Sequence, residues 1–282
     1  MLNGLLLGGL YACVAAGFSL VWGVMNVINL LHGTLVVLGS YLAWMAFHFW
    51  GIHPLVALPG VTLLVGAFGA CLQAGPLKRV VGSPVLVTLV VTFGLDLLTR
   101  NALLLGFGAD YRTIRPASPW GTAELAGLII PLDRAMAASV ALAMTAALYL
   151  LLRRSWLGRA IVAVRMDRDA AALMGVRVQR TFIAAFALSA ALAGAAGAVL
   201  SLVFPISPLQ SEAYLGTAFT VCVLGGLGSV VGAIAGGVAL GLVESVAGFV
   251  FGSENATIVS FILLILLLAL RPEGLFGRRG YA

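Results

Sequence analysis

The sequence predicts an all-α, polytopic transmembrane helical bundle. Of its 282 residues, 62% are hydrophobic and only 9% are charged, and the mean hydropathy is +1.12. A soluble domain carries about 25% charged residues, so lipid must be the solvent for most of this surface. The apolar runs are too long and too uniform for the alternating strands of a barrel. We therefore expect residues 1–282 to form a single transmembrane domain.

Nine apolar runs mark candidate spans, since a span needs about 20 mostly apolar residues. They lie near residues 3–25, 31–50, 54–76, 84–106, 130–152, 181–204, 214–228, 231–251 and 256–270. Eight or ten spans are alternatives, and polar breaks leave room for discontinuous helices. The first run lacks a basic stretch before it and a small-residue cleavage site, which favours a retained span over a cleaved signal peptide.

The basic residues indicate which loops face the cytoplasm, because cytoplasmic loops carry an excess of Lys and Arg. The loop 153–180 holds seven Arg, and placing it inside brings twelve Lys and Arg to that side and leaves three outside. We therefore expect a multi-pass protein with a cytoplasmic C-terminus. The charges lie between apolar runs rather than in a stripe on a soluble surface, so we expect a membrane rather than nucleic acid beside them.

The opposite loop, 108–129, is predicted to be an ordered cap at the outer membrane surface. It contains Pro116, Pro119 and Trp120. Its aromatic residues are either interfacial anchors or a docking surface for a soluble partner.

A short helix with marked ends is predicted inside the basic loop. Asp167 or Asp169 can cap its N-terminus, and Gly175 fits a left-handed C-terminal position. A helix this short is marginal alone in water, so it needs something to pack against. The apolar side chains available for a partner are Ala171, Leu173, Met174 and Val176. The alternative is an ordinary surface helix of a basic loop.

The spacing Asp169-Ala170-Ala171-x-x-x-Gly175 resembles the EAA loop of ABC-importer permeases, in which a short cytoplasmic helix docks on the ATPase subunit. Asp replaces the usual Glu, and the downstream proline is missing. Four stretches resemble permeases of branched-chain amino-acid ABC importers, of the LivH more than the LivM type, a pattern shared by urea and amide relatives. They are INLLHGTLVVLGSY at 28–41, LGRAIVAVRMDRDAAALMGV at 157–176, VLGGLGSVVGAIAGGVALGLVES at 223–245 and LRPEGLFG at 270–277.

The resemblance implies a permease subunit of an ATP-driven importer of branched-chain amino acids, or a related small polar solute, in the bacterial inner membrane. The implied partners are a second permease, identical or different, two cytoplasmic ATPases that use ATP and Mg²⁺, and a periplasmic solute-binding protein. The ATPase-coupling residues would be Gly158, Arg159, Asp167, Asp169, Ala170, Ala171, Leu173, Met174 and Gly175. The chain has no G-x-x-x-x-G-K-[ST] phosphate loop, so we expect it to bind no cofactor itself.

Polar residues that interrupt the first apolar stretch are candidates for the substrate pathway. Asn26, Asn29 and His32 followed by Gly33 stand where a continuous helix is expected. Exposed backbone in such a break survives only against protein or a wet cavity. The residues either line the route of the solute or form a tight turn at the cytoplasmic edge.

Charged residues inside spans are costly, which makes them further pathway candidates. Asp96 and Arg100 lie four residues apart on one helical face and can pair there. Alternatively, Arg100 reaches the outer interface with Asp96 as its counter-ion. Glu244 has no basic residue within a turn, so it must face the bundle interior, a cavity or the second permease, either in the pathway or as a hydrogen-bond acceptor between helices.

Glycines around Glu244 indicate close helix packing. They are Gly225, Gly226, Gly228, Gly232, Gly236, Gly237 and Gly241. Because neither G-x-S-x-G nor H-E-x-x-H is present, we expect no catalytic and no metal site. The principal alternative to the importer is an ion-coupled secondary transporter in which Asp96 or Glu244 titrates.

Overall fold

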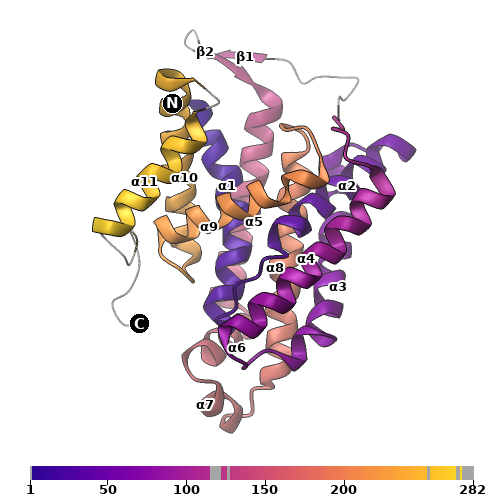
Figure 1. Ribbon diagram of the computed structural model, residues 1–282, viewed down its shortest axis with the longest axis vertical. Coiled ribbons are helices and arrows are strands. Elements are labelled where there is room, and N and C mark those ends of the chain that lie inside the picture. The colour runs from indigo at the N-terminus through magenta and orange to yellow at the C-terminus, as the bar shows by residue number, and fades with distance from the viewer. Residues whose placement is uncertain (1, 115–121, 126–127, 253–254, 271–273, 275–282) are drawn as a thin grey trace.

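The computed structural model describes residues 2–114, 122–125, 128–252, 255–270 and 274, and folds them into a bundle of helices (Figure 1). The α-helices are α1 (Leu2–Met25), α2 (His32–Trp50), α3 (Pro54–Ala74), α4 (Val85–Phe107), α5 (Leu132–Arg154), α6 (Trp156–Met166), α7 (Arg168–Leu173), α8 (Val178–Leu200), α9 (Ser211–Gly225), α10 (Val230–Phe251) and α11 (Ala256–Leu270). Two 3₁₀ turns, η1 (Leu77–Arg79) and η2 (Pro208–Gln210), and two strands, β1 (Thr122–Leu125) and β2 (Leu128–Pro131), complete the elements.

All nine predicted runs are helical in the described part of the chain, which confirms the polytopic all-α fold. Among the described residues, seven helices are long and apolar enough to cross a membrane: α1, α2, α3, α4, α5, α8 and α10. The other two, α9 and α11, have 15 residues each. At 1.5 Å per residue they reach about 22 Å, short of the hydrocarbon thickness of about 30 Å. Within the described residues, seven of the nine predicted runs thus reach full span length.

The centre of the bundle is formed by α1, which packs against α10, α8, α5 and α9 (Figure 1). Small residues allow this close contact: a methyl group added at Gly237 would lie 2.7 Å from both the Gly8 carbonyl oxygen and the Ala12 nitrogen. On the other side, α8 packs against α3 and α2. The core is thus built by backbone approach, as is typical of membrane helices.

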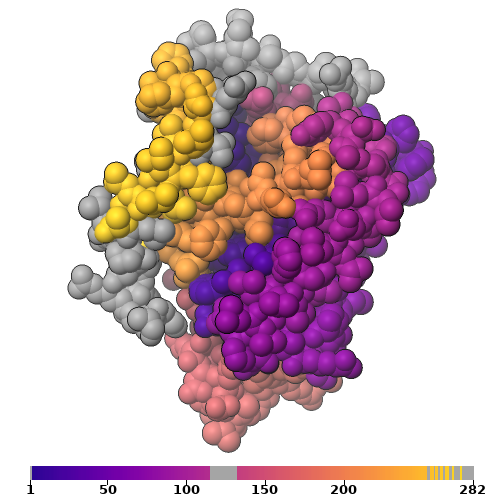
Figure 2. All heavy atoms as spheres, in the orientation of Figure 1, coloured from indigo at the N-terminus to yellow at the C-terminus, as the bar shows by residue number. Residues whose placement is uncertain are grey.

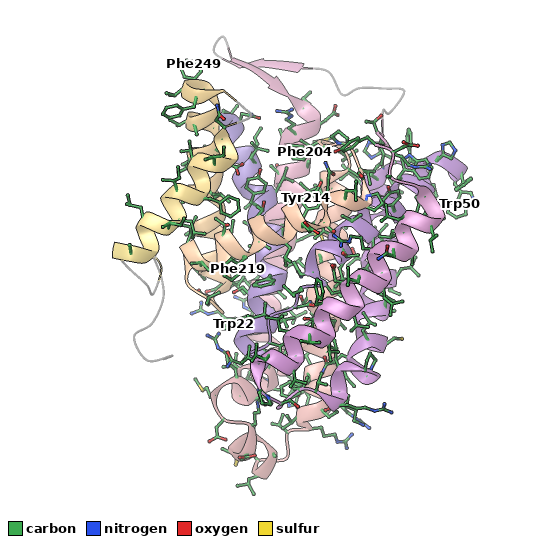
Figure 3. All side chains as sticks on the ribbon, in the orientation of Figure 1. Trp22, Trp50, Phe204, Tyr214, Phe219 and Phe249 are labelled. Carbon is green, nitrogen blue, oxygen red and sulfur yellow. The ribbon has the colours of Figure 1, made fainter. Side chains whose placement is uncertain are left out.

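The outer faces of the bundle carry large apolar side chains. Phe249 of α10 and Trp50 at the end of α2 are exposed and point away from the bundle (Figure 3). Further exposed leucines lie along α3 and α4, among them Leu63, Leu86 and Leu105. Such a surface suits contact with lipid or with a second membrane subunit.

The two ends of the bundle differ in structure. At one end β1 and β2 form an antiparallel hairpin in which Thr122 lies opposite Pro131 (Figure 1). At the other end α6 and α7 protrude (Figures 1 and 2). The sequence analysis predicted a cap in the region of the hairpin but no strands. Pro116, Pro119 and Trp120 lie outside the described residues, as does most of the segment 271–282.

Candidate functional site

The short helix predicted in the basic loop is α7, and both of its ends are closed by hydrogen bonds. Asp167 is the N-cap, because its Oδ1 accepts from the backbone N–H of Asp169 and of Ala170, each at 2.9 Å. Gly175 has φ of +83°, the left-handed conformation that favours glycine. Of the two candidate caps, the structure therefore selects Asp167, and Asp169 lies in the first turn.

The side chains of α7 divide into a buried and an exposed set. Ala171 is 5% exposed, because it packs against the rest of the chain, whereas Leu173 is 89% and Met174 84% exposed. Val176 is half-buried. The expectation that Ala171 is available to a partner was wrong. The large apolar side chains that remain exposed here are Leu173, the last residue of α7, and Met174 directly after it.

A second helix, α6, precedes α7 and was not predicted. Ser155 caps it by accepting from the N–H of Gly158 at 2.8 Å, and a methyl at Gly158 would lie 2.5 Å from the Leu151 carbonyl oxygen. Gly158 therefore allows α6 to fold back on the end of α5. The signal was present in the sequence: Leu157, Ile161 and Val164 repeat at helical spacing behind a serine cap.

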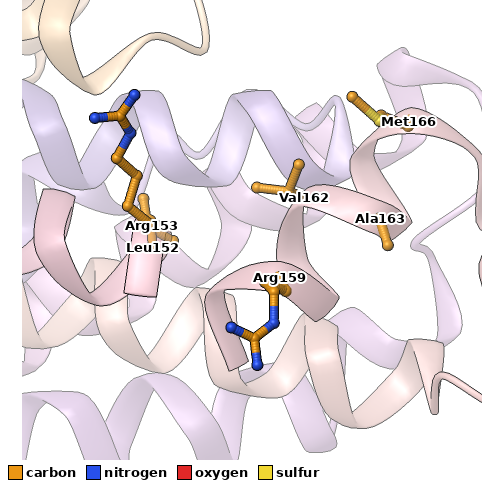
Figure 4. A pocket seen from close by; sticks show the side chains of 6 residues that line it. All are labelled: Leu152, Arg153, Arg159, Val162, Ala163 and Met166. Carbon is orange, nitrogen blue, oxygen red and sulfur yellow. The ribbon is translucent and has the colours of Figure 1, made fainter. Parts of the chain in front are cut away.

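A shallow open groove of about 370 Å³ lies between α5 and α6 (Figure 4). Its lining combines apolar side chains with two guanidinium groups: Leu152, Arg153, Arg159, Val162, Ala163 and Met166. Arg159 is exposed, and its Nη1 donates to the carbonyl of Arg154 at 3.4 Å. The groove lies on α5 and α6, and the exposed Leu173 and Met174 lie at the end of α7, so both features belong to the end of the molecule where α6 and α7 protrude (Figure 1).

Two arginines connect this end of the molecule to the bundle. Arg168, in the first turn of α7, donates from Nη2 to the carbonyl of Met25 at the end of α1, at 3.0 Å. Arg165 of α6 donates from Nη1 to the carbonyl of Gly228, in the turn between α9 and α10, at 2.7 Å. From the sequence, these two arginines were expected only to set the topology of the basic loop. A displacement of α6 and α7 would therefore be transmitted directly to α1 and to α10.

The glycines of the 225–241 run lie where α10 meets α9 and α1. Methyl groups at Gly232 and Gly236 would collide with the backbone of Gly225, and those at Gly237 and Gly241 with the backbone of α1. Gly226 and Gly228 have φ of +96° and +80° in the turn before α10. The structure thus places all seven glycines in tight contacts or in that turn.

Glu244 lies in the same contact between α1 and α10. Its Oε2 accepts a hydrogen bond from the hydroxyl of Tyr11 at 2.7 Å, and the pair is partly buried. Of the alternatives left open by the sequence, this geometry matches hydrogen bonding between helices.

The break after α1 is a re-entrant segment rather than a tight turn at the membrane edge. The ring Nε2 of His32, the first residue of α2, lies 2.8 Å from the carbonyl of Val14 and therefore donates to it. Val14 stands eleven residues before the end of α1, about 16 Å along the helix. The segment 26–31 thus returns into the bundle, where Asn29 and His32 are buried, whereas Asn26 is exposed and has φ of +56°.

Gly33 permits the first turn of α2 to meet the first turn of α9. A methyl added at Gly33 would lie 2.9 Å from the Ser211 carbonyl carbon and 3.0 Å from Leu215 Cβ. Two helices that begin inside the bundle therefore touch at their starts, a contact that the sequence analysis did not foresee.

Asp96 is only 8% exposed, and Arg100 does not form a salt bridge with it. The hydroxyl of Thr34 donates to Asp96 Oδ1, and Arg100 is paired with Glu212 in the first turn of α9. Thr92, one turn before Asp96, donates to the carbonyl of Ile28 at 3.0 Å. The predicted pairing of Asp96 with Arg100 was therefore wrong, because each side chain has a nearer partner on another segment.

Comparison with known proteins gives a family match over most of the chain. Residues 1–268 match the model of the branched-chain amino acid transport system permease component. The chain is 31% identical, over 99% of its length and 95% of the relative, to the high-affinity branched-chain amino acid transport system permease protein BraD of Pseudomonas aeruginosa. It is 32% identical to LivH of Escherichia coli K12, over 99% and 94% of the two chains, and 27% identical to LivM of the same strain, over 94% and 67%. No solved structure matches it.

Proposed function

Because the chain belongs to the family of permease components of branched-chain amino acid transport systems, we propose that it is the membrane permease of an ATP-driven importer. It carries branched-chain amino acids, or a related small polar solute, across the bacterial inner membrane. The relatives LivH and LivM are both named as permease proteins of the high-affinity branched-chain amino acid transport system, which supports a second permease as a partner. Two cytoplasmic ATPases, with ATP and Mg²⁺, and a periplasmic solute-binding protein complete the proposed assembly.

The observation that carries this proposal is the surface formed by α6 and α7. Leu173 and Met174 are almost fully exposed, and in the chain they stand between Arg168 and Arg177. Charged residues are strongly disfavoured in hydrocarbon, so an apolar patch set among arginines fits a protein partner better than lipid. On the positive-inside rule, this end and the C-terminus are cytoplasmic, where an ATPase would dock.

The hydrogen bonds of Arg165 and Arg168 supply a physical route for coupling. A rigid helix that is bound by another subunit moves as a unit. Arg168 links α7 to the C-terminal end of α1, and Arg165 links α6 to the turn before α10. Closure of the ATPases would thus change the packing of the central helices. In this proposal, that movement opens the pathway of the solute alternately to the two sides of the membrane.

Reconstitution tests the energy source. The chain is purified with the products of its neighbouring genes, and leucine uptake into proteoliposomes is measured with ATP enclosed, with a non-hydrolysable ATP analogue, and with an imposed proton or sodium gradient. We expect uptake only with hydrolysable ATP and the ATPase subunits. Uptake that continues without ATPases and stops when the ion gradient is abolished would instead identify an ion-coupled secondary transporter.

A further inference from the structure

The bundle-facing side of α4 is polar although the helix lies in a membrane. The residues that α4 buries are Thr88, Thr92, Asp96 and Leu103, so three of four are polar. The remainder of the helix exposes apolar side chains such as Leu86, Leu98 and Leu105. A polar face in a membrane helix must be matched by protein groups or a wet path, and helix packing alone does not require it.

Three side chains on this face reach three different segments. Thr92, Asp96 and Arg100 are spaced by four residues and so share one face of α4. They contact the Ile28 carbonyl, the Thr34 hydroxyl and the Glu212 carboxylate, respectively. These contacts fall on the break before α2, on the first turn of α2 and on the first turn of α9. Discontinuous helices of this kind are where transporters bind their solutes.

Two buried polar groups without partners are sequence neighbours of the residues that make these contacts. The side-chain amide of Asn29, next to Ile28, and the hydroxyl of Ser211, next to Glu212, make no hydrogen bond within the described chain. Both residues are more than nine-tenths buried. An unsatisfied buried polar group costs about 1–3 kcal/mol, so a polar ligand that reached Asn29 or Ser211 would be favoured there.

We propose that Asp96 and Arg100 bind the ammonium and the carboxylate of an α-amino acid during its passage. The inference rests on the proposed function and assigns the two charges of its amino-acid solute to named side chains. Side chains one helical turn apart have Cβ atoms about 5–6 Å apart, a separation that a solute with adjacent opposite charges can bridge. Arginine binds carboxylates through two parallel hydrogen bonds.

The partners seen in the structure explain how the site exists without solute. Glu212 holds Arg100, and Thr34 donates to one oxygen of Asp96. An entering carboxylate exchanges with Glu212, and an entering ammonium uses the second oxygen of Asp96. Because the zwitterion is neutral overall, the charge of the site stays balanced during the exchange.

Charge reversal separates this role from a structural ion pair. In the complete importer we expect Arg100→Gln to lower leucine uptake about tenfold or more, whereas Glu212→Gln retains at least half of it. The exchanged double variant Arg100→Glu with Glu212→Arg restores a structural pair but not a carboxylate site, so we expect its uptake to stay low. Equal loss in the two single variants with recovery in the double variant would overturn the proposal.

Asp96 is tested by a matched pair of changes. Asp96→Asn keeps an acceptor for Thr34 but removes the charge, and we expect about a tenfold loss of uptake; Thr34→Val keeps the charge and should retain most of it. Arg134→Gln, at a half-buried arginine that donates a hydrogen bond to Asn3, is the control for removal of a positive charge. Equal losses in Asp96→Asn and Thr34→Val would contradict the proposal.

A direct measurement of solute binding tests the proposed site without any energy source for transport. Radiolabelled leucine is bound to the importer in lipid nanodiscs with the solute-binding protein omitted. We expect competition by unlabelled leucine, none by 4-methylpentanoic acid or 3-methylbutylamine, which lack one charge, and loss of binding in Arg100→Gln. If wild-type uptake depends on ATP but both uptake and binding survive Asp96→Asn and Arg100→Gln, this inference fails while the proposed function stands. If binding follows the expected pattern but uptake does not depend on ATP, the proposed function fails while this inference stands.

Discussion

Helices α4 and α7 both expose large apolar side chains, yet the two surfaces have different surroundings. Leu98 of α4 lies near the middle of a 23-residue apolar helix, whereas Leu173 of α7 lies within a few residues of Arg168, Asp169 and Arg177. Exposure within a span is the ordinary condition of a lipid-facing residue. Exposure among charges at the end of the bundle instead indicates a protein partner, because neither water nor hydrocarbon suits the whole patch.

The largest expected effect is a charge placed on the lipid-facing surface. Leu98→Glu puts a carboxylate near the middle of a span, at a cost of about 2.5–3.5 kcal/mol on insertion scales. We expect the amount of folded chain in the membrane to fall sharply, as measured by fluorescence-detected size-exclusion chromatography. Leu173→Glu is the control and should leave that amount unchanged. Equal loss in both variants would erase the distinction between the two surfaces.

The same charge on the α7 surface should act on function instead. Leu173→Glu combined with Met174→Glu desolvates two carboxylates wherever a partner covers them. We expect ATP-dependent uptake to fall by about tenfold or more. We also expect less of the ATPase subunits to co-purify with this variant. Leu98→Ala should leave both unchanged. Normal uptake in the double variant would mean that no partner covers Leu173 and Met174.

A smaller effect is expected from the C-terminal end of α7. Gly175→Val forces a β-branched residue to φ near +83°, at about 1–3 kcal/mol. The strain misplaces α7 locally, so we expect ATP hydrolysis to continue while uptake per ATP declines. Gly175→Asn, which tolerates the left-handed conformation, should behave like the wild type. Coupled uptake in the valine variant would show that the position of α7 does not matter.

The smallest effect is expected at the links between α6–α7 and the bundle. Arg168→Gln removes a charged hydrogen bond to Met25, of the order of 1.5–3 kcal/mol, shared between folding and coupling. We expect ATPase subunits to co-purify normally and uptake to fall only a few-fold. Arg153→Gln, in the groove but with no such link among the described contacts, gives the comparison. Loss of ATPase co-purification in Arg168→Gln would place this residue in the docking surface itself.

Apolar run length was enough to predict the helices but not their depth. All nine runs are helical because lipid leaves the backbone no other way to satisfy its hydrogen bonds. Composition does not show that α2 begins beside Val14 halfway along α1, because that start depends on the His32 contact. Composition likewise predicts spans at α9 and α11, although the structure describes only 15 helical residues in each. Hydropathy measures surroundings, not position along the membrane normal.

The partners of the charged residues could not be read from local spacing. Asp96 and Arg100 share a helical face, so pairing was the natural prediction, but Thr34 and Glu212 lie 62 and 112 residues away in the chain. Long-range contacts of this kind appear only once the helices are packed. The polar stripe of Thr88, Thr92 and Asp96 was visible in the sequence at a spacing of four, and it would have identified the bundle-facing side of α4.

The most direct test places a photoreactive residue on each of the two surfaces. p-Benzoylphenylalanine is introduced at Leu173 of α7 and, separately, at Leu98 of α4, and the importer is irradiated in its native membrane. We predict a covalent product between the Leu173 variant and an ATP-hydrolysing subunit, and no such product from the Leu98 variant. An α7 probe that never reaches a nucleotide-hydrolysing protein, in cells where uptake is active, would contradict the assignment of this chain to an ATP-driven importer.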